Sequence, residues 1–239
     1  MCGRFVIATS PDGLAVRFLP RVTDSELDAM LASGEIVQVL NNYQVQPTNR
    51  VPVITNTDGR RRIEVVRWNL IPSFWKDPDK LPPMNFNARS ENLDSGMWRD
   101  AFRRSRCLIS ATGFYEWPVK GPGRPPVFIY REDGSLLAFA GAVDTWMNPR
   151  TNELMRSCTI ATSKPNSFMS AIHDRMPVVL PDSEAETLWL GPASQLAGVR
   201  RLTEPYKWDG MAYHWVRPLR QDANGPELIE PATEQLALA

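Results

Sequence analysis

The residues at the start of the chain could carry out covalent chemistry on a carbonyl group. Residue 2 is a cysteine, and removal of Met1 would leave Cys2 with a free α-amine and a thiol on adjacent carbons. The reference pKa of an α-amine is about 7.7–8.0 and that of a thiol about 8.5, so near pH 7 some unprotonated amine and some thiolate are present. Such an amine forms a reversible imine with an aldehyde, and the thiol then closes a five-membered thiazolidine. The alternative is a cysteine that packs as a small hydrophobic residue.

Two internal motifs each hold one titratable side chain of a kind used for proton transfer. The stretch from Gly113 to Trp117 places Glu116 among aromatic residues after a predicted strand. Desolvation there would disfavour the charged carboxylate and bring its pKa closer to neutrality. The stretch from Ala171 to Pro177 places His173 between apolar and charged neighbours, where an imidazole is a natural general acid or base. The alternatives are a solvated glutamate at a strand end and a histidine held only by hydrogen bonds.

Further stretches have the composition of a nucleic-acid contact. Phe74 and Trp75 follow a proline turn and precede Lys76, so they could offer a stacking surface for bases beside a cation for phosphate. The polar stretch 85–91 is, by itself, typical of a loop with an Asx-turn. Adjacent aromatics are more often core residues, and charged runs are more often solvated faces. Local arginine clusters that could contact phosphates lie at positions 60 to 62 and at 99, 103, 104 and 106.

The overall composition limits the class of protein. The chain has 239 residues, 43% of them hydrophobic, which suits a packed globular protein. Lys and Arg total 27, as do Asp and Glu, so no net charge draws the protein to nucleic acid, and an anionic partner must meet a local patch. Three scattered cysteines and two histidines argue against a disulfide framework, a zinc site or a histidine-rich metal centre. We expect no metal and no cofactor.

The same features predict a cytoplasmic protein. An odd number of cysteines without a close pair is typical of a reducing compartment. No charged segment followed by an apolar one opens the chain, and the longest apolar stretch, Leu136 to Val143, is too short to span a bilayer. We therefore expect no membrane partner.

The elements that must position these residues are short, and strands outnumber helices. Thr23 and Glu26 have the spacing of a capping box, which predicts a helix that ends near Gly34. Asp58-Gly59 between two apolar runs predicts a hairpin over 51–68. Together the elements predict one α+β domain, with a curved, mainly antiparallel and barrel-like β-sheet core flanked by helices. The other predicted elements are a helix from Gly96 to Arg104, a helix behind a second capping box of Ser183 and Glu186, and strands at Cys107 to Ala111, Val127 to Arg131, Leu136 to Val143 and Ser157 to Thr162.

The order of the motifs resembles that of one known family. The chain is similar to the SRAP family, the SOS-response-associated peptidase-like proteins that shield abasic sites in DNA. The resemblance runs from Met1 to about Pro231, which predicts a SRAP domain over 1–231 and a C-terminal tail over 232–239. The motifs that carry it are Met1-Cys2-Gly3-Arg4-Phe5, Trp68 with Leu70-Ile71-Pro72-Ser73, Asn87-Ala88-Arg89-Ser90-Glu91, Gly113-Phe114-Tyr115-Glu116-Trp117 and Ile172-His173-Asp174-Arg175-Met176-Pro177.

The resemblance also implies which residues act and on what. It implies a single α+β domain with a positively charged DNA groove, and single-stranded DNA that contains abasic sites as the partner. We expect the protein to be a monomer. The implied catalytic residues are Cys2, Asn87, Glu116 and His173. The implied DNA-binding residues are Phe74 and Trp75 against bases, Arg4 and Arg89 on phosphates, and Trp117 in the same motif as Glu116.

The predicted function is that of an abasic-site sensor with a covalent mechanism. The Cys2 amine attacks the C1 aldehyde of the ring-opened abasic sugar, and the sulfur closes a thiazolidine that leaves the strand unbroken and shielded. The same groups are expected to assist removal of Met1, a peptidase or hydrolase activity, besides any lyase-like activity on the sugar. Two alternatives remain: an N-terminal-nucleophile glutamine amidotransferase, and a DNA-binding module without covalent chemistry.

The sequence departs from the family pattern at several positions outside the implied catalytic residues. The family's Tyr-Asn-Val-Ala-Pro stretch carries Gln44 and Gln46 here, and the glycine after Trp68 is Asn69. A stretch near the C-terminus reads His214-Trp215-Val216-Arg217 in place of histidine-proline-valine-serine. These positions belong to loops expected to border the groove, so they bear on DNA binding.

Overall fold

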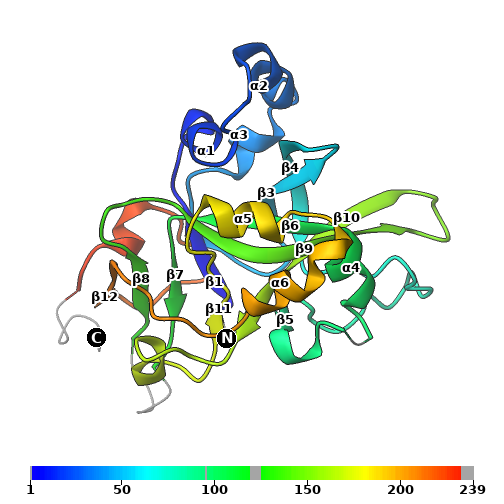
Figure 1. Cartoon of the computed structure of the whole chain (residues 1–239). Coiled ribbons are helices and arrows are strands. Elements are labelled where there is room, and N and C mark those ends of the chain that lie inside the picture. Colours follow the sequence, from blue (N-terminus) through cyan, green and yellow to red (C-terminus); the bar gives the residue numbers. More distant parts are fainter. Residues whose placement is uncertain (1, 95, 119–124, 233–239) are drawn as a thin grey trace.

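Short strands and short helices make up the chain in a computed structural model that describes residues 2–94, 96–118 and 125–232 (Figure 1). Met1 and positions 233–239 of the predicted tail lie outside the described residues. The α-helices are α1 (Pro11–Phe18), α2 (Asp24–Leu31), α3 (Glu35–Val39), α4 (Arg99–Arg104), α5 (Ser183–Trp189) and α6 (Leu196–Arg201). The strands are β1 (Arg4–Ile7), β2 (Asn42–Val45), β3 (Arg50–Thr57), β4 (Arg60–Trp68), β5 (Asn87–Arg89), β6 (Arg106–Ala111), β7 (Gly113–Glu116), β8 (Val127–Arg131), β9 (Leu137–Met147), β10 (Leu154–Ser163), β11 (Met176–Pro177) and β12 (Met211–Trp215).

The strands form two sheets that share a mainly antiparallel pattern. One sheet has the order β12-β8-β7-β1-β2, and the other has the order β11-β10-β4-β3-β6-β9, with β5 also paired to β10. Strand β9 also pairs with β10, so β10, β4, β3, β6 and β9 close into a barrel. Among the described strands, the parallel pairs are those that β10 makes with β4 and β5. Helix α5 packs against β6, β9 and α6, and α2 and α3 lie beside β3 and β4 (Figure 1). The predicted α+β class with a mainly antiparallel, barrel-like core flanked by helices is confirmed, with a second sheet in addition to the barrel.

Local signals place several elements where the sequence predicts them. At the start of α2, Thr23 Oγ1 accepts a hydrogen bond from the Glu26 N–H at 3.3 Å, and Glu26 Oε2 accepts one from the Thr23 N–H at 2.9 Å. This is the predicted capping box. Between β3 and β4, Asp58 and Gly59 both have positive φ, 52° and 78°, as a two-residue hairpin turn of this hand requires.

Two predicted helix starts are wrong. Helix α4 begins at Arg99 and not at Gly96, because Gly96 has a φ of 53° in the left-handed region. Helix α5 is capped by Asp182, whose Oδ1 accepts a hydrogen bond from the Ala185 N–H at 2.8 Å. Glu186, the predicted partner in a capping box, is fully buried and pairs instead with Arg17 and Arg61.

The core is continuous with the strands that carry the candidate site. Trp68 is fully buried, and its ring centroid lies 4.9 Å from that of Phe5 on β1. The Trp68 indole N–H donates to the Phe86 carbonyl at 2.8 Å, directly before Asn87. Burying an aromatic side chain of this kind contributes about 1.5–3 kcal/mol to stability. The core therefore fixes the backbone on both sides of the N-terminal motif and of Asn87.

Candidate functional site

Strand β10 brings two distant motifs together. On one side it pairs with β5, where Ile160 lies opposite Asn87. On its other side it pairs with β11, where Ser163 lies opposite Met176, three residues after His173. The short strands β5 and β11 thus deliver Asn87 and His173 to the same end of one long strand.

A second pairing delivers Cys2 and Glu116. Strand β1 runs antiparallel to β7, with Arg4 opposite Tyr115. The chain just before Arg4 therefore lies beside the end of β7, where Glu116 is the last strand residue. The four predicted catalytic residues come from four separate segments, and the contacts below show that they form one cluster.

Asn87 makes the contact that joins the two halves of the cluster. Its Nδ2 donates to the Cys2 carbonyl oxygen at 2.9 Å. Its Oδ1 is buried and has no hydrogen-bond partner among the described residues. A buried amide oxygen without a partner is costly, so this acceptor is suited to a donor that the processed N-terminus or a substrate would bring.

Glu116 and His173 form the titratable part of the cluster. Nε2 of His173 lies 3.8 Å from Oε2 of Glu116, whose side chain is 2% exposed. Burial raises the pKa of Glu116 to about 7, the direction that its aromatic surroundings predicted. Desolvation lowers the pKa of His173, which keeps the ring neutral near pH 7. Glu116 is therefore close to the point at which it can either give or take a proton, beside a neutral imidazole.

Three groups surround Nδ1 of the His173 imidazole. The Arg175 backbone N–H lies 3.0 Å from it, the Arg175 carbonyl oxygen 3.2 Å and Oδ1 of Asp174 3.0 Å. A neutral ring therefore either accepts at Nδ1 and carries its proton on Nε2, or donates from Nδ1 and accepts at Nε2, the nitrogen that faces Glu116.

The Cys2 thiol differs from the sequence-based expectation. The side chain is fully buried, and desolvation, together with the nearby Glu116, raises the pKa of the Cys2 thiol well above its usual value. The expectation of some thiolate near pH 7 is therefore wrong for this environment, because a charged sulfur is disfavoured in a buried site beside a carboxylate. A neutral thiol needs a base to take its proton when the sulfur reacts.

Arg4, Trp117 and Arg89, three of the predicted DNA-binding residues, lie next to the cluster along the chain. The Arg4 guanidinium carbon lies 5.8 Å from the centre of the Trp117 ring, a cation–π arrangement, and Trp117 is 38% exposed. Arg89 ends β5, two residues after Asn87, and is exposed. The structure thus joins Arg4 and Trp117 on the β1–β7 side, with Arg89 on the β5 side.

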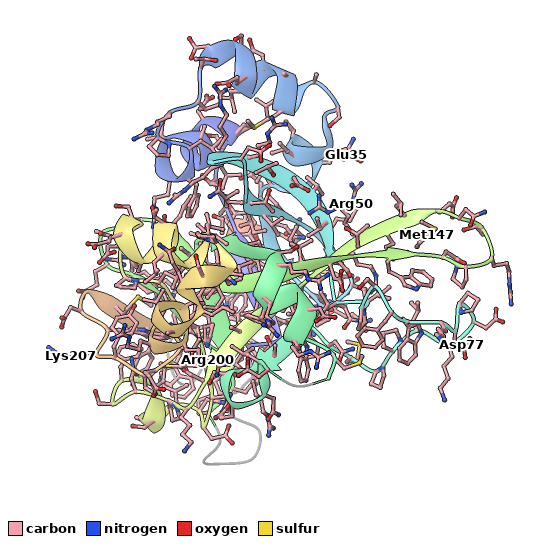
Figure 2. All side chains as sticks on the ribbon, turned by 45° about the vertical axis from the view of Figure 1, so that its right-hand side comes forward. Glu35, Arg50, Asp77, Met147, Arg200 and Lys207 are labelled. Atoms are coloured by element: carbon pink, nitrogen blue, oxygen red, sulfur yellow. The ribbon has the colours of Figure 1, made fainter. Side chains whose placement is uncertain are left out.

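Phe74 and Trp75, the predicted stacking pair, lie on a loop that packs along the β9–β10 hairpin. Phe74 is 49% exposed, whereas Trp75 is half-buried and its indole N–H donates within the loop to the Asp77 and Lys80 carbonyls, each at 2.9 Å. Trp146 of β9 donates its indole N–H to the Trp75 carbonyl at 2.6 Å. Figure 2 shows Asp77 of this loop and Met147 of the hairpin projecting on the same side of the molecule. Phe74 offers the open ring face, and Trp75 holds the loop together.

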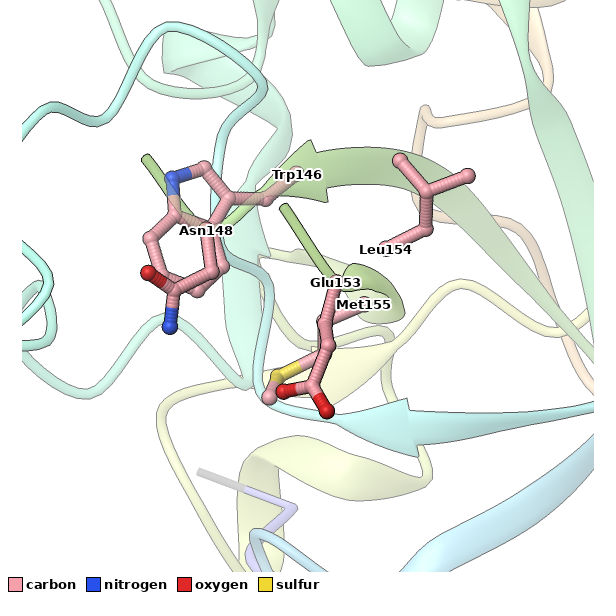
Figure 3. Close-up of a pocket in the computed structure, with 5 residues that line it drawn as sticks. All are labelled: Trp146, Asn148, Glu153, Leu154 and Met155. Carbon is pink, nitrogen blue, oxygen red and sulfur yellow. The ribbon is translucent and has the colours of Figure 1, made fainter. Parts of the chain in front are cut away.

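Two surface hollows lie away from the cluster of Cys2, Asn87, Glu116 and His173. One of about 380 Å³ lies on the hairpin and is lined by Trp146, Asn148, Glu153, Leu154 and Met155 (Figure 3). A larger one of about 1380 Å³ lies between α2 and the β3–β4 hairpin. Neither is lined by Cys2, Asn87, Glu116 or His173.

Sequence reasoning assigned no role to several residues that support the site. Glu91 pairs with Arg175 through both oxygens, at 2.7 and 3.0 Å, and so ties η1 (Ser90–Asn92) to the His173 segment. This pair lowers the pKa of Glu91 to about 2. Both residues stand in quoted motifs, but only the fold shows that they meet.

Asn69, a departure from the family glycine, is held in a backbone conformation that favours glycine. Its φ is 147°, and its Oδ1 accepts a hydrogen bond from the Asn85 N–H at 2.6 Å. This bond closes the base of the loop that carries Phe74 and Trp75. The side chain therefore offers a contact that the family glycine lacks.

Within the part of the chain that the structure describes, no group of three or more His, Cys, Asp or Glu side chains is arranged to hold a metal ion. None of the helices found in the same residues has the length and apolar character needed to cross a bilayer. All three cysteines are buried free thiols.

The mixed α+β fold and its N-terminal cysteine cluster define a class, and comparison with known proteins agrees. The chain belongs to the SRAP family, described as SOS response associated peptidase, whose profile matches residues 1–220. It is 37% identical over 235 residues to the abasic site processing protein YoqW of Bacillus subtilis (strain 168), covering 96% of this chain and 99% of that protein. It is 31% identical over 225 residues to the abasic site processing protein HMCES of Gallus gallus, covering 80% of this chain and 66% of that protein. A crystal structure of a protein from Bacteroides thetaiotaomicron, 26% identical, has a TM-score of 0.85 over 97% of this chain and 100% of that one.

Proposed function

We propose that this protein senses abasic sites in single-stranded DNA and shields them through a covalent thiazolidine crosslink to Cys2. The observation that carries the proposal is the contact of Asn87 with Cys2, beside the facing pair of Glu116 and His173. The relatives named above as abasic site processing proteins support the choice of substrate.

The reaction begins with exposure of the Cys2 amine. Hydrolysis of the peptide bond between Met1 and Cys2 releases methionine and leaves Cys2 with a free α-amine. This amine then has the buried Oδ1 of Asn87 as a hydrogen-bond acceptor, while Nδ2 of the same amide keeps the Cys2 carbonyl in place. Such positioning lowers the activation barrier of the attack, because the amine need not be brought to the aldehyde from solution.

Imine formation needs several proton movements. The amine nitrogen attacks C1 of the ring-opened sugar, and the nitrogen loses a proton while the aldehyde oxygen gains one to give a carbinolamine. That hydroxyl then leaves as water after a further proton reaches it, and the nitrogen of the resulting iminium gives up its remaining proton to leave a neutral imine. Glu116, with a pKa of about 7, can take the first proton and return the second. His173, whose Nε2 faces Glu116, can relay protons to and from the carboxyl.

Ring closure uses the sulfur. The Cys2 thiol adds to the imine carbon, its proton passes to the imine nitrogen, and a five-membered thiazolidine results with no loss of atoms. Because burial keeps the thiol protonated, the carboxylate of Glu116 is the base that carries this proton. Closure removes the imine that would otherwise promote strand cleavage by elimination.

DNA binding in this proposal uses two kinds of contact. Arg4 and Arg89 flank the cluster and would hold phosphates on either side of the abasic sugar. Phe74 would stack on an unpaired base, a contact that single strands offer and intact duplex does not. Net charge of zero means that these local contacts supply the affinity.

The experiment that tests the proposal is a denaturing gel with single-stranded DNA that contains one abasic site. We expect a heat-stable adduct with wild type, and intact-mass spectrometry of the active protein that shows Met1 removed. The variant Cys2→Ala should bind the same DNA but give no stable adduct. Hydrolysis of glutamine without an adduct would instead support the amidotransferase alternative, and binding without an adduct by wild type would support the non-covalent module.

A further inference from the structure

Gln44 on β2 joins three segments of the chain. Its side chain is buried, with 4% of the residue exposed. Its Nε2 donates to the carbonyls of Arg220 and Ala223, each at 2.8 Å, and its Oε1 accepts from Nη1 of Arg4. One amide therefore links β1, β2 and the segment near 220–224.

The two carbonyl partners determine which way the amide faces. An amide nitrogen has two N–H donors and no acceptor, and both donors are used by the Arg220 and Ala223 carbonyls. The oxygen of Gln44 must then point to the other side, toward Arg4. A flipped amide would set its oxygen against two carbonyl oxygens, so the acceptor for Arg4 is fixed by its surroundings.

Arg4 is held without being neutralised. Its partners among the described residues are the Gln44 amide oxygen and the face of Trp117, at 5.8 Å from the ring centre, and neither carries a formal charge. Arg175 offers the contrast, because the Glu91 carboxylate grips its guanidinium at 2.7 and 3.0 Å and cancels its charge. A guanidinium stays protonated in proteins, so Arg4 keeps a full positive charge for a partner from outside.

We propose that Gln44 is a positioning residue that orients Arg4 toward a DNA phosphate while leaving its charge available. This deepens the proposed function and rests on it. Gln44 itself contacts no DNA; it acts through Arg4, and Trp117 supports the guanidinium from its other side. A carboxylate at this position would hold Arg4 equally firmly but would compete with the phosphate for it.

The test is a double-mutant cycle on non-covalent DNA binding. Binding of abasic single-stranded DNA is measured in a Cys2→Ala background across a range of salt, with Arg4→Ala, Gln44→Met and the pair. Loss of one phosphate contact on a single strand lowers the slope of log affinity against log salt by about 0.7. When the salt concentration is raised from 50 to 200 mM, the fold-decrease in affinity of each variant should therefore be about 2.6 times smaller than that of its parent.

The control variant is Asn224→Ala. Asn224 lies in the same C-terminal segment, and its Oδ1 accepts a hydrogen bond from the Tyr43 N–H at 2.7 Å, so it joins this segment to β2 without touching Arg4. It should leave the slope unchanged. Thermal melting checks that each variant is folded, and where Gln44→Met is not, Gln44→Leu replaces it, since it also removes the amide.

The outcomes separate the inference from the function on which it rests. An equal decrease of the salt slope in Arg4→Ala, Gln44→Met and the double variant supports the inference, because the second substitution then removes no further phosphate contact. A lower slope in Arg4→Ala with the parent's slope in Gln44→Met overturns it, as do additive losses in the pair. Adduct formation is measured separately with Cys2 intact, and its absence in wild type would reject the proposed function whatever the cycle shows.

Discussion

The imidazole Nε2 of His173 faces the Oε2 of Glu116 at 3.8 Å, although 56 residues separate them along the chain. Burial keeps the Glu116 carboxyl protonated to higher pH, and burial keeps the His173 imidazole neutral to lower pH. The carboxyl, with a pKa of about 7, is therefore the member of the pair that changes its charge near pH 7. This pair is the basis for the first two predictions.

The rate of adduct formation should depend on both members of the pair. We expect Glu116→Gln and His173→Ala each to slow crosslinking to abasic single-stranded DNA by roughly 10²-fold, the low end for general acid–base catalysis. With Glu116 acting as the base for the thiol proton, the wild-type rate should rise with pH through about 7, where its carboxyl ionises. The measurement is a time course on denaturing gels from pH 5.5 to 8.5. Wild-type rates in both folded variants would place the proton transfers elsewhere.

Glu116→Gln should make the protein more stable at high pH. The folded-state pKa of Glu116 is about 7, against 4.5 for an ordinary glutamate, so the folded state binds more protons between these values and stability falls as pH rises through them. The difference between these two pKa values corresponds to a destabilisation of about 3 kcal/mol by the wild-type carboxylate. This destabilisation is complete above pH 7 and absent below pH 4.5. Denaturant unfolding at pH 4 and pH 8 should show the variant gaining stability only at pH 8. An equal effect at both pH values would mean that the carboxyl titrates normally.

Stacking and phosphate contacts should respond differently to salt. Phe74→Ala and Trp75→Ala should each weaken binding by about 1–3 kcal/mol with little change in the salt slope, because base stacking releases no counterions. Phe74 acts through its exposed ring, whereas Trp75 also holds the loop through its bonds to Asp77 and Lys80. Both variants should lower the preference for single strands over duplex, measured by fluorescence anisotropy.

Arg89→Ala serves as the matched contrast within the same assay. It should weaken binding and flatten the salt slope by about 0.7, the value for one phosphate contact on a single strand. If Phe74→Ala and Trp75→Ala both bind like wild type, or if single strands and duplex bind equally, the aromatic pair does not contact bases.

Removing the buried carboxylate of Glu186 should destabilise the fold without touching the cluster. Glu186 is fully buried and pairs with Arg17 at 2.5 Å and with Arg61 at 3.2 Å, which joins α5 to α1 and β4. Glu186→Ala leaves two guanidiniums facing each other, and we expect a loss of about 3 kcal/mol, the low end for a broken buried pair because both arginines reach solvent. Urea unfolding measures the loss. Glu35→Ala breaks an exposed ion pair with Arg50; both residues are labelled in Figure 2. This variant should lower the free energy of unfolding by less than about 1 kcal/mol.

The features that the sequence predicts correctly depend on neighbours a few residues apart. The capping box of Thr23 with Glu26 and the turn at Asp58-Gly59 involve backbone groups within four positions, so local chemistry decides them. Glu186 shows the limit. Its spacing from Ser183 is that of a capping box, yet Arg17 and Arg61 draw it into the interior, and these partners lie 169 and 125 positions away.

The sequence by itself determined the chemical groups of this site: an N-terminal cysteine, an amide, a carboxylate and an imidazole, in motifs of recognisable order. Only the tertiary structure decided that they meet, because the pairing of β10 with β5 and β11, and of β1 with β7, is set by contacts between distant strands. It also decided their protonation, since burial raises the pKa of Cys2 and of Glu116. Solvent exclusion is a property of the packed fold, and the spacing of residues along the chain does not determine it.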